Sequence, residues 1–286
     1  MAYQVVCFGE ILFDIFGSKA EPGGAPFNVA YHLQQAGISS YLISSIGKDT
    51  YGEKLLLQLQ QWGISTDGLQ ISETYATGKA IVSHDSGNQP VFELVFPVAW
   101  DYISWQERYR QVITDADAFV FGSLASRNPC SYDTLMQCLE YASLNVCDIN
   151  MRPPHFSETT IGSLLARTHI LKLNSAELLQ LNEWYGTGGN DEQEQVNTIR
   201  ERFNIPEVIV TKGGEGASYY GAGVVLHQEA IKVKVVDTVG SGDAFLAGFL
   251  SKRLAPGYSL QECLLEAARR GAYVASRKGA CPGEDQ

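Results

Sequence analysis

The sequence predicts an α/β domain with a mainly parallel central sheet, helices on both faces of that sheet, and a small β lid. Strand-like runs rich in β-branched and aromatic residues alternate with segments of helical spacing along most of the chain. A chain of 286 residues, 45% of them apolar, can bury one large core. One β hairpin interrupts the alternation between residues 77 and 97. We therefore expect a single domain over residues 1–286, with the lid formed by parts of 10–20 and 77–97.

The apolar spacing places the elements in order along the chain. Strands are expected at residues 3–8, 11–16, 41–46, 118–121, 145–149, 169–173 and 207–211, with a hairpin at 217–220 and 224–227. Helices are expected at residues 27–37, 52–62, 104–113, 132–141, 161–166, 176–184, 195–203, 241–253 and 260–278. Strands separated by helices pair in parallel, and such sheets bind ligands at the carboxyl ends of their strands.

The second strand of the predicted lid is apolar on both faces, since Phe92 and Leu94 alternate with Val91 and Val95. One face would cover a bound substrate, and the other would be buried by a second copy of the chain in a homodimer. Ordinary packing of the hairpin against the main body is the alternative.

Composition narrows the class of protein. The formal net charge of -11 argues against a nucleic-acid surface, so any affinity for phosphate must be local. The six cysteines never approach C-x-x-C spacing, and we expect no structural zinc. The first residues lack the basic and apolar regions of a secretory leader, and no apolar run is long enough to span a membrane. We expect a cytoplasmic protein without a membrane partner.

The segment 237–243 is the strongest functional pattern in the chain. Gly240, Ser241 and Gly242 form a turn just before an apolar helical segment, where backbone N–H groups can converge on an anion. Asp243, at the junction of turn and helix, suits a group that accepts a hydroxyl proton, and an ordinary helix-capping aspartate is the alternative. The last glycine of a dinucleotide fingerprint is missing, and no G-x-x-x-x-G-K-[ST] motif occurs.

Two polar residues near the N-terminus are further candidates. Asp14 lies inside an otherwise apolar run, where burial is costly unless the carboxylate finds a partner such as a sugar hydroxyl. Asn28 falls in the first turn of a predicted helix, after a break at Gly23 and Gly24 that would also suit a hinge. A turn aspartate and a helix-capping asparagine are the alternatives.

Polar residues also follow two of the predicted strands. Asp148, Asn150 and Arg152 occur at alternate positions at the end of one strand. Asn174 and Glu177 follow the next strand, where they could hold Mg²⁺ through water or orient phosphate, or simply begin a helix.

A glycine-rich loop from Lys212 to Gly216 follows the strand at 207–211. The loop could accommodate the ribose and base of a nucleotide, and a simple hairpin turn is the alternative.

Together these residues resemble the ribokinase-like sugar kinases of the PfkB family across nearly the whole chain. The N-terminal glycine signature of that family is matched at residues 23–30 (GGAPFNVA), and its C-terminal signature at residues 237–245 (DTVGSGDAF). The runs FGEILFD at 8–14, GSLA at 122–125 and DINMRPP at 148–154 look most like fructokinases.

The resemblance implies a role for each matching residue. Asp243 would take the proton of the accepting hydroxyl, while Gly240, Ser241 and Gly242 would donate backbone hydrogen bonds to the transferred phosphoryl group. The sugar would contact Asp14, Gly24, Asn28 and Arg152. The nucleotide would contact Asn174, Thr211, Lys212, Gly213 and Gly216, and Mg²⁺ would lie near Glu177, held through water.

The resemblance therefore implies a sugar kinase that uses ATP and Mg²⁺ and makes fructose 6-phosphate from D-fructose. A kinase for another ketose, for 2-keto-3-deoxygluconate or for a nucleoside is the nearest alternative. A sugar-sensing protein that keeps the fold without turnover is another, although the intact motif from Gly240 to Asp243 speaks against it. A monovalent cation such as K⁺ stays open as a further cofactor.

Overall fold

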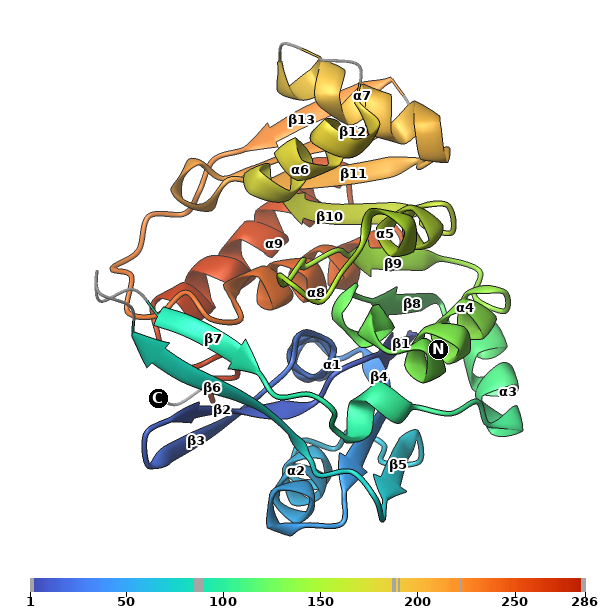
Figure 1. Ribbon diagram of the computed structural model, residues 1–286. Helices are drawn as coiled ribbons and strands as arrows, with labels where there is room; N and C mark the ends of the chain where they lie inside the picture. Colours follow the sequence, from blue (N-terminus) through green and yellow to red (C-terminus); the bar gives the residue numbers. More distant parts are fainter. Residues whose placement is uncertain (1–2, 85–89, 187–188, 190, 222, 284–286) are drawn as a thin grey trace.

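The computed structural model describes residues 3–84, 90–186, 189, 191–221 and 223–283. Its larger sheet has nine strands within these residues (Figure 1). Their spatial order is β13 (Val224–Gln228), β12 (Ala217–Gly221), β11 (Glu207–Thr211), β10 (Ile170–Asn174), β9 (Asn145–Asp148), β8 (Ala118–Phe121), β1 (Gln4–Phe8), β4 (Ser39–Gly47) and β5 (Leu69–Ser72). The strands from β11 to β5 pair in parallel, whereas β12 and β13 pair antiparallel at one edge.

Helices cover both faces of this sheet (Figure 1). One face packs against α1 (Ala25–Gln35), α2 (Thr50–Gln61), α8 (Ser241–Arg253) and α9 (Leu260–Ala275). The other packs against α3 (Glu107–Asp115), α4 (Pro129–Leu139), α5 (Glu158–Leu165), α6 (Ser175–Tyr185) and α7 (Glu192–Phe203).

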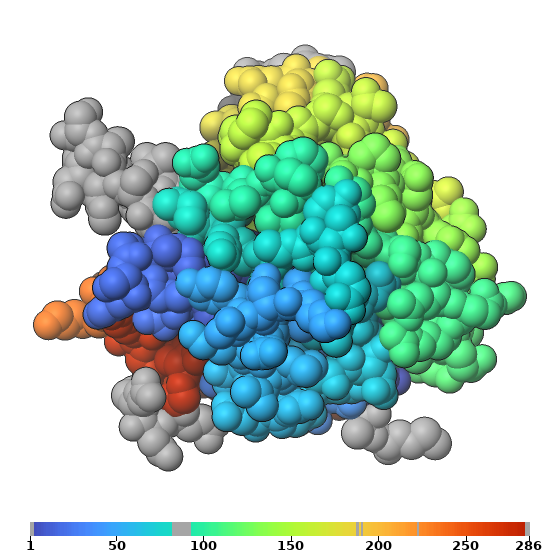
Figure 2. All heavy atoms as spheres, turned by 60° about the horizontal axis from the view of Figure 1, so that its bottom comes forward, coloured from blue at the N-terminus to red at the C-terminus, as the bar shows by residue number. Residues whose placement is uncertain are grey.

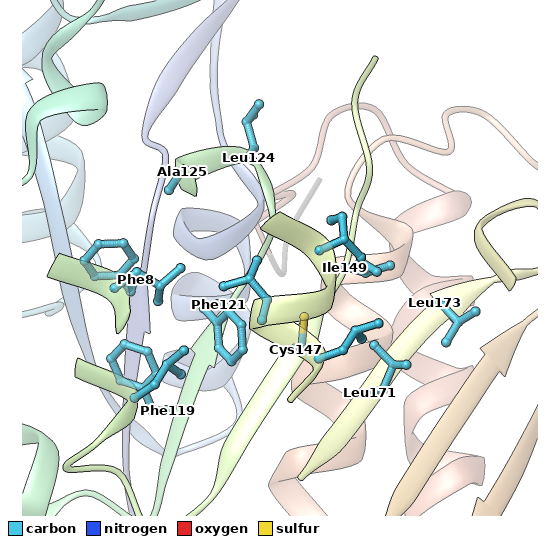
Figure 3. Close-up of a cluster of buried hydrophobic side chains, with 14 of the residues drawn as sticks. Phe8, Phe119, Phe121, Leu124, Ala125, Cys147, Ile149, Leu171 and Leu173 are labelled. Atoms are coloured by element: carbon cyan, nitrogen blue, oxygen red, sulfur yellow. The ribbon is translucent and has the colours of Figure 1, made fainter. Parts of the chain in front are cut away.

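The alternation of side chains along β1 joins these two apolar cores. Val5 and Cys7 belong to the core beneath α1 and α8, while Val6 and Phe8 belong to the core on the opposite face. Successive strand side chains point to opposite faces, so a central strand with helices on both sides is apolar throughout. Figure 3 shows Phe8 in the second core, with Phe121 and other side chains of neighbouring strands.

A second, smaller sheet has the order β3 (Lys19–Gly23), β2 (Leu12–Phe16), β6 (Gly78–His84) and β7 (Pro90–Leu94). β2 pairs antiparallel with β3 and parallel with β6, which pairs antiparallel with β7. Figure 2 shows the N-terminal hairpin of this sheet, in dark blue, at the edge of the molecule. Residues 85–89 of the predicted hairpin and the side chains of Val91 and Phe92 lie outside the described residues.

The predicted fold class is confirmed, and most of the expected elements begin and end within about three residues of their predicted bounds. Two strands were not predicted. β3 is polar and contains Pro22, and β5 is only four residues long, so both depend on pairing with a neighbouring strand more than on local propensity. No helix in the described part of the chain is both long and apolar enough to cross a bilayer.

Candidate functional site

A cavity of about 560 Å³ lies at the carboxyl ends of the parallel strands β1, β9, β10 and β11. Most of the residues that the sequence singled out line it: Asp14, Gly24, Asn28, Asp148, Asn150, Arg152, Asn174, Glu177, Thr211, Gly240, Gly242 and Asp243. Ser241, Lys212, Gly213 and Gly216 are not among its lining residues. This is the place where open parallel sheets bind their ligands.

The glycine turn opens onto this cavity at the N-terminus of α8. Gly240 is the N-cap residue with a φ of 76°, and a Cβ at that position would lie 2.5 Å from the Cβ of Ala280. Ala244 N donates to Gly240 O at 2.9 Å, which begins the hydrogen bonding of the helix. The N–H groups of Gly242 and Asp243 come before Ala244 in the chain and have no acceptor within the helix. Free N–H groups and the helix dipole favour an anion here.

Asp243 does not cap its helix, and Asn28 does not cap α1. The N-cap residues are Gly240 and Gly24, and the two polar side chains bond to each other, with Asn28 Nδ2 donating to Asp243 Oδ2 at 2.8 Å. The thiol of Cys281 donates to Asn28 Oδ1 at 3.4 Å. Both side chains are therefore held at the cavity wall by a tertiary contact.

Burial raises the pKa of Asp243 to about 7, and the negative charge of Asp148 adds to this effect. The hydrogen bond from Asn28 and the charges of Lys172 and Arg152 act in the opposite direction. A carboxylate with a pKa near neutrality is a better proton acceptor than an ordinary aspartate, yet it is still ionised at slightly alkaline pH.

Lys172, on β10, places a buried positive charge next to Gly242 of the glycine turn. Its Nζ donates to Asp148 Oδ2 at 2.6 Å, and a Cβ built on Gly242 would lie 3.2 Å from the same nitrogen. Burial opposes the charge on Lys172, but the charge and hydrogen bond of Asp148 outweigh it and raise the pKa. Sequence reasoning missed this residue, although a lysine inside an apolar strand was a usable signal.

Glu10 and Asp14 also line the cavity. Glu10 Oε1 accepts a hydrogen bond from Ala25 N at 3.2 Å, and burial raises the pKa of this carboxyl to about 7. Burial also raises the pKa of Asp14 to about 6, although Arg152 opposes the shift. Glu10 was not predicted as a site residue; like Asp14, it interrupts an apolar run.

The glycines beside Glu10 and Asp14 allow this close approach. Gly24 has a φ of 113°, and a Cβ there would collide with the carbonyl oxygen of Glu10. A Cβ on Gly23 would lie 2.8 Å from Asp14 Oδ2.

Asn174 and Glu177 form a capping box at the N-terminus of α6. Asn174 Oδ1 accepts from Glu177 N at 2.9 Å, and Glu177 Oε2 accepts from Asn174 N at 2.8 Å. Glu177 Oε1 also accepts from Met151 N at 2.9 Å, and burial raises the pKa of this carboxyl. Both side chains still line the cavity, but their oxygen atoms already accept hydrogen bonds from backbone N–H groups.

The glycine-rich loop after β11 is a hairpin turn. Lys212 N donates to Gly216 O at 2.8 Å, and a Cβ on Gly216 would collide with the carbonyl oxygen of Gln228. The ammonium group of Lys212 bonds to Ser218 Oγ at 2.6 Å and to Glu192 Oε1 at 3.1 Å. Thr211, the last residue of β11, lines the cavity, whereas Lys212, Gly213 and Gly216 do not.

Comparison with known protein sequences gives consistent matches over most of the chain. A family model described as "pfkB family carbohydrate kinase" matches residues 4–286. "Probable fructokinase-7" of Arabidopsis thaliana is 30% identical over 307 residues, covering 97% of this chain and 88% of that protein. A fructokinase of Salmonella typhimurium is 26% identical over 272 residues, covering 91% of this chain and 87% of that protein.

Solved structures share the fold. A fructokinase from Xylella fastidiosa with bound ATP superimposes with a TM-score of 0.86 at 22% identity, covering 98% of this chain and 94% of that chain. An aminoimidazole riboside kinase from Salmonella enterica, complexed with aminoimidazole riboside and an ATP analogue, gives a TM-score of 0.81 at 25% identity. That match covers 97% of this chain and 95% of the other.

Proposed function

The chain belongs to the pfkB family of carbohydrate kinases, and we propose that it transfers the γ-phosphoryl group of ATP to the 6-hydroxyl of D-fructose. One observation carries the chemistry: Asp243, with its pKa raised to about 7, lies at the open N-terminus of α8 in the main cavity. The choice of fructose is supported by the relatives named as fructokinases that match 97% and 91% of this chain.

In this proposal Asp243 orients the accepting hydroxyl and takes its proton. A phosphoryl transition state is loose and needs positioning and charge stabilisation more than covalent chemistry, so the proton moves late. Asn28 keeps the carboxylate turned toward the cavity, and the hydrogen bond favours its ionised form. Asp14, Gly24, Asn28 and Arg152 are proposed to contact the sugar.

The N-terminus of α8 supplies the stabilising charge for the transferred group. We assign this role to the backbone N–H groups around Gly240, Ser241 and Gly242, with Lys172 behind them. Since the donors are fixed before the reaction, little reorganisation is needed as negative charge develops.

Magnesium fits this site only through water. Glu177 already accepts two backbone hydrogen bonds, and the described residues hold no group of three or more acidic, His or Cys side chains placed to bind a metal. Mg²⁺ typically keeps several waters and is held by one or two carboxylates and the nucleotide phosphates. Bound with ATP, it would neutralise phosphate charge, with Asn174 and Glu177 orienting its waters.

The nucleotide is proposed to lie along the end of β11. Thr211 lines the cavity there, and its Oγ1 donates to Leu173 O at 3.3 Å. The hairpin turn with Lys212, Gly213 and Gly216 is proposed to flank the ribose and base.

The chain is proposed to form a single domain. Its small sheet is proposed to act as a lid over the sugar and to form the interface between two chains of a homodimer. Ala80 and Leu94 of this sheet line the cavity, which supports the first role. Phe16 and Ile81 are 39% and 38% exposed, which supports the second. A mass of one chain by light scattering at micromolar concentration would contradict the dimer.

The first experiment measures ADP release with Mg-ATP across fructose, ribose, 2-keto-3-deoxygluconate and adenosine, in potassium chloride and in choline chloride. Asp243→Asn is assayed beside the native protein. We expect fructose-dependent turnover that falls about 10²–10⁴-fold in the variant. Turnover on a nucleoside instead would favour the alternative that the riboside kinase likeness suggests. Sugar binding without turnover on any acceptor would indicate a sensor.

A further inference from the structure

Glu10 has one carboxylate oxygen that nothing in the described structure satisfies. The residue is 3% exposed and lies in the loop between β1 and β2. Its Oε1 accepts from Ala25 N, and the backbone N–H of Glu10 itself also favours the charged carboxylate. Its Oε2 is nevertheless buried without a partner of hydrogen-bond geometry among the described residues. A buried acceptor that loses its hydrogen bonds to water costs free energy, so such an atom in a binding cavity calls for a partner from the ligand.

The place of Glu10 indicates which ligand that is. It lines the same cavity as Asp14, Asn28, Arg152 and Asp243. The charge of Asp243 raises the pKa of Glu10, and that of Arg152 lowers it, so Glu10 is close enough to sense both groups. No Lys or Arg within the described residues forms an ion pair with Glu10.

We propose that Glu10 is a specificity-determining residue whose Oε2 accepts a hydrogen bond from one hydroxyl group of the sugar acceptor. The inference rests on the proposed function, because it requires a polyhydroxylated substrate in this cavity. A sugar that lacks the contacted hydroxyl would leave Oε2 buried and unpaired, and sites of this kind strongly reject such analogues.

The hydrogen bond from Ala25 makes the proposal sharply testable. Because Ala25 N can only donate, a glutamine at position 10 would keep its oxygen toward Ala25 and turn its NH₂ group toward the sugar. Glu10→Gln therefore replaces an acceptor by a donor at the position of Oε2. Glu10→Met, of similar length, removes hydrogen bonding altogether.

The experiment uses the acceptor that the native enzyme turns over best, together with its monodeoxy and deoxyfluoro analogues at each hydroxyl. Assays run at pH 8.5, because burial raises the pKa of Glu10 to about 7 and the carboxylate must be ionised. For one position we expect the native kcat/KM to fall roughly 10- to 100-fold with the deoxy analogue. In Glu10→Met the ratio of kcat/KM for the parent sugar to kcat/KM for this deoxy analogue should approach one. The same ratios for the analogues at other positions should stay unchanged.

The deoxyfluoro analogue separates a sugar contact from a structural role. Fluorine accepts hydrogen bonds weakly and donates none, so it opposes a carboxylate but tolerates an amide N–H. We expect the preference for this analogue over the deoxy analogue to rise about tenfold in Glu10→Gln at that one position. Asp14→Asn is the matched control and should alter selectivity at a different hydroxyl, since its carboxylate lies on β2.

Outcomes for the inference and for the proposed function are distinct. Unchanged ratios at every position in both folded Glu10 variants, with turnover intact, would overturn the role of Glu10 and leave the kinase assignment standing. Silence of the native enzyme with every acceptor would instead contradict the proposed function. In that case calorimetry measures the dissociation constants of the parent sugar and of each analogue. Equal ratios of these constants in the native and variant proteins would still overturn the inference.

Discussion

Asn28 Nδ2 donates to Asp243 Oδ2 at 2.8 Å, joining the first helix to a residue 215 positions later in the chain. An ionised carboxylate has no proton to donate, so the amide nitrogen must face it and the amide oxygen must face away. The thiol of Cys281 lies on that oxygen side, 3.4 Å from Asn28 Oδ1. Three segments of the chain thus fix the orientation of one carboxylate.

The hydrogen bond between Asn28 and Asp243 predicts the pH dependence of turnover. Asp243 accepts a proton only when ionised, so kcat/KM should fall as the pH drops below about 7. Asn28→Ala removes an interaction that lowers the pKa of Asp243. This fall in kcat/KM, the acidic limb of the pH profile, should therefore move to higher pH. The measurement is kcat/KM between about pH 5.5 and 9; Cys281→Ser, which keeps a donor, serves as the control. A limb that stays in place or moves to lower pH in Asn28→Ala would contradict the assignment.

Asp243 should also lower the stability of the fold at alkaline pH. Its pKa rises from 3.8 to about 7 on burial, so the ionised form is disfavoured in the folded state. The cost is absent below about pH 4, grows as the pH rises, and is complete above about pH 7. Asp243→Asn should therefore increase the free energy of unfolding at pH 8.5 by up to about 4 kcal/mol, with little gain at pH 4.

Urea denaturation at the two pH values measures this difference, with the exposed Asp133→Asn as a control. An equal effect of Asp243→Asn at both pH values would refute the expected linkage.

Lys172 and Asp148 should shift the acidic limb in opposite directions. Lys172 lowers the pKa of Asp243 and Asp148 raises it, so Lys172→Met should move the limb to higher pH and Asp148→Asn to lower pH. Lys172→Met also leaves a buried carboxylate unpaired, which typically costs about 3–5 kcal/mol of stability. Chemical denaturation and pH profiles of both variants test this pair, and shifts of the same sign would contradict it.

Gly240→Ala should impair both stability and turnover. The left-handed backbone and the contact with Ala280 leave no room for a side chain, and such strain typically costs about 1–3 kcal/mol. Displaced N–H groups at the start of α8 should lower kcat by about 100-fold or more. Gly257→Ala is the matched control, because its φ of 89° is also left-handed while a Cβ there meets nothing within 4 Å. Similar activities for the two variants would argue against the anion site.

The sequence predicted the fold well because its signals are local. Apolar runs between helical segments identified the parallel strands, and the glycine turns marked the places where the backbone changes direction. β3 escaped prediction because KAEPG has no apolar pattern and pairs only through β2.

Many of the cavity-lining residues could be singled out in the sequence, but their arrangement could not. Asn28 and Asp243 were both candidates, yet no periodicity links two side chains so far apart in the chain. Glu10 and Lys172 were missed because each lies in or next to a strand whose neighbours are apolar, and the strand pattern dominated the interpretation. Asn174 and Glu177 cap α6, and both also line the cavity, so the metal and phosphate role stays a prediction.

The 215-residue separation between Asn28 and Asp243 has a consequence for protein synthesis. At about 5–20 residues per second, a ribosome makes Asp243 roughly 10–40 s after Asn28. During that interval α1 has been made, but α8, which packs on the same face of the sheet, has not. The surface of α1 that α8 covers therefore stays without its partner until the second half of the chain is made, while the contacts of α1 with β1 and β4 can form earlier.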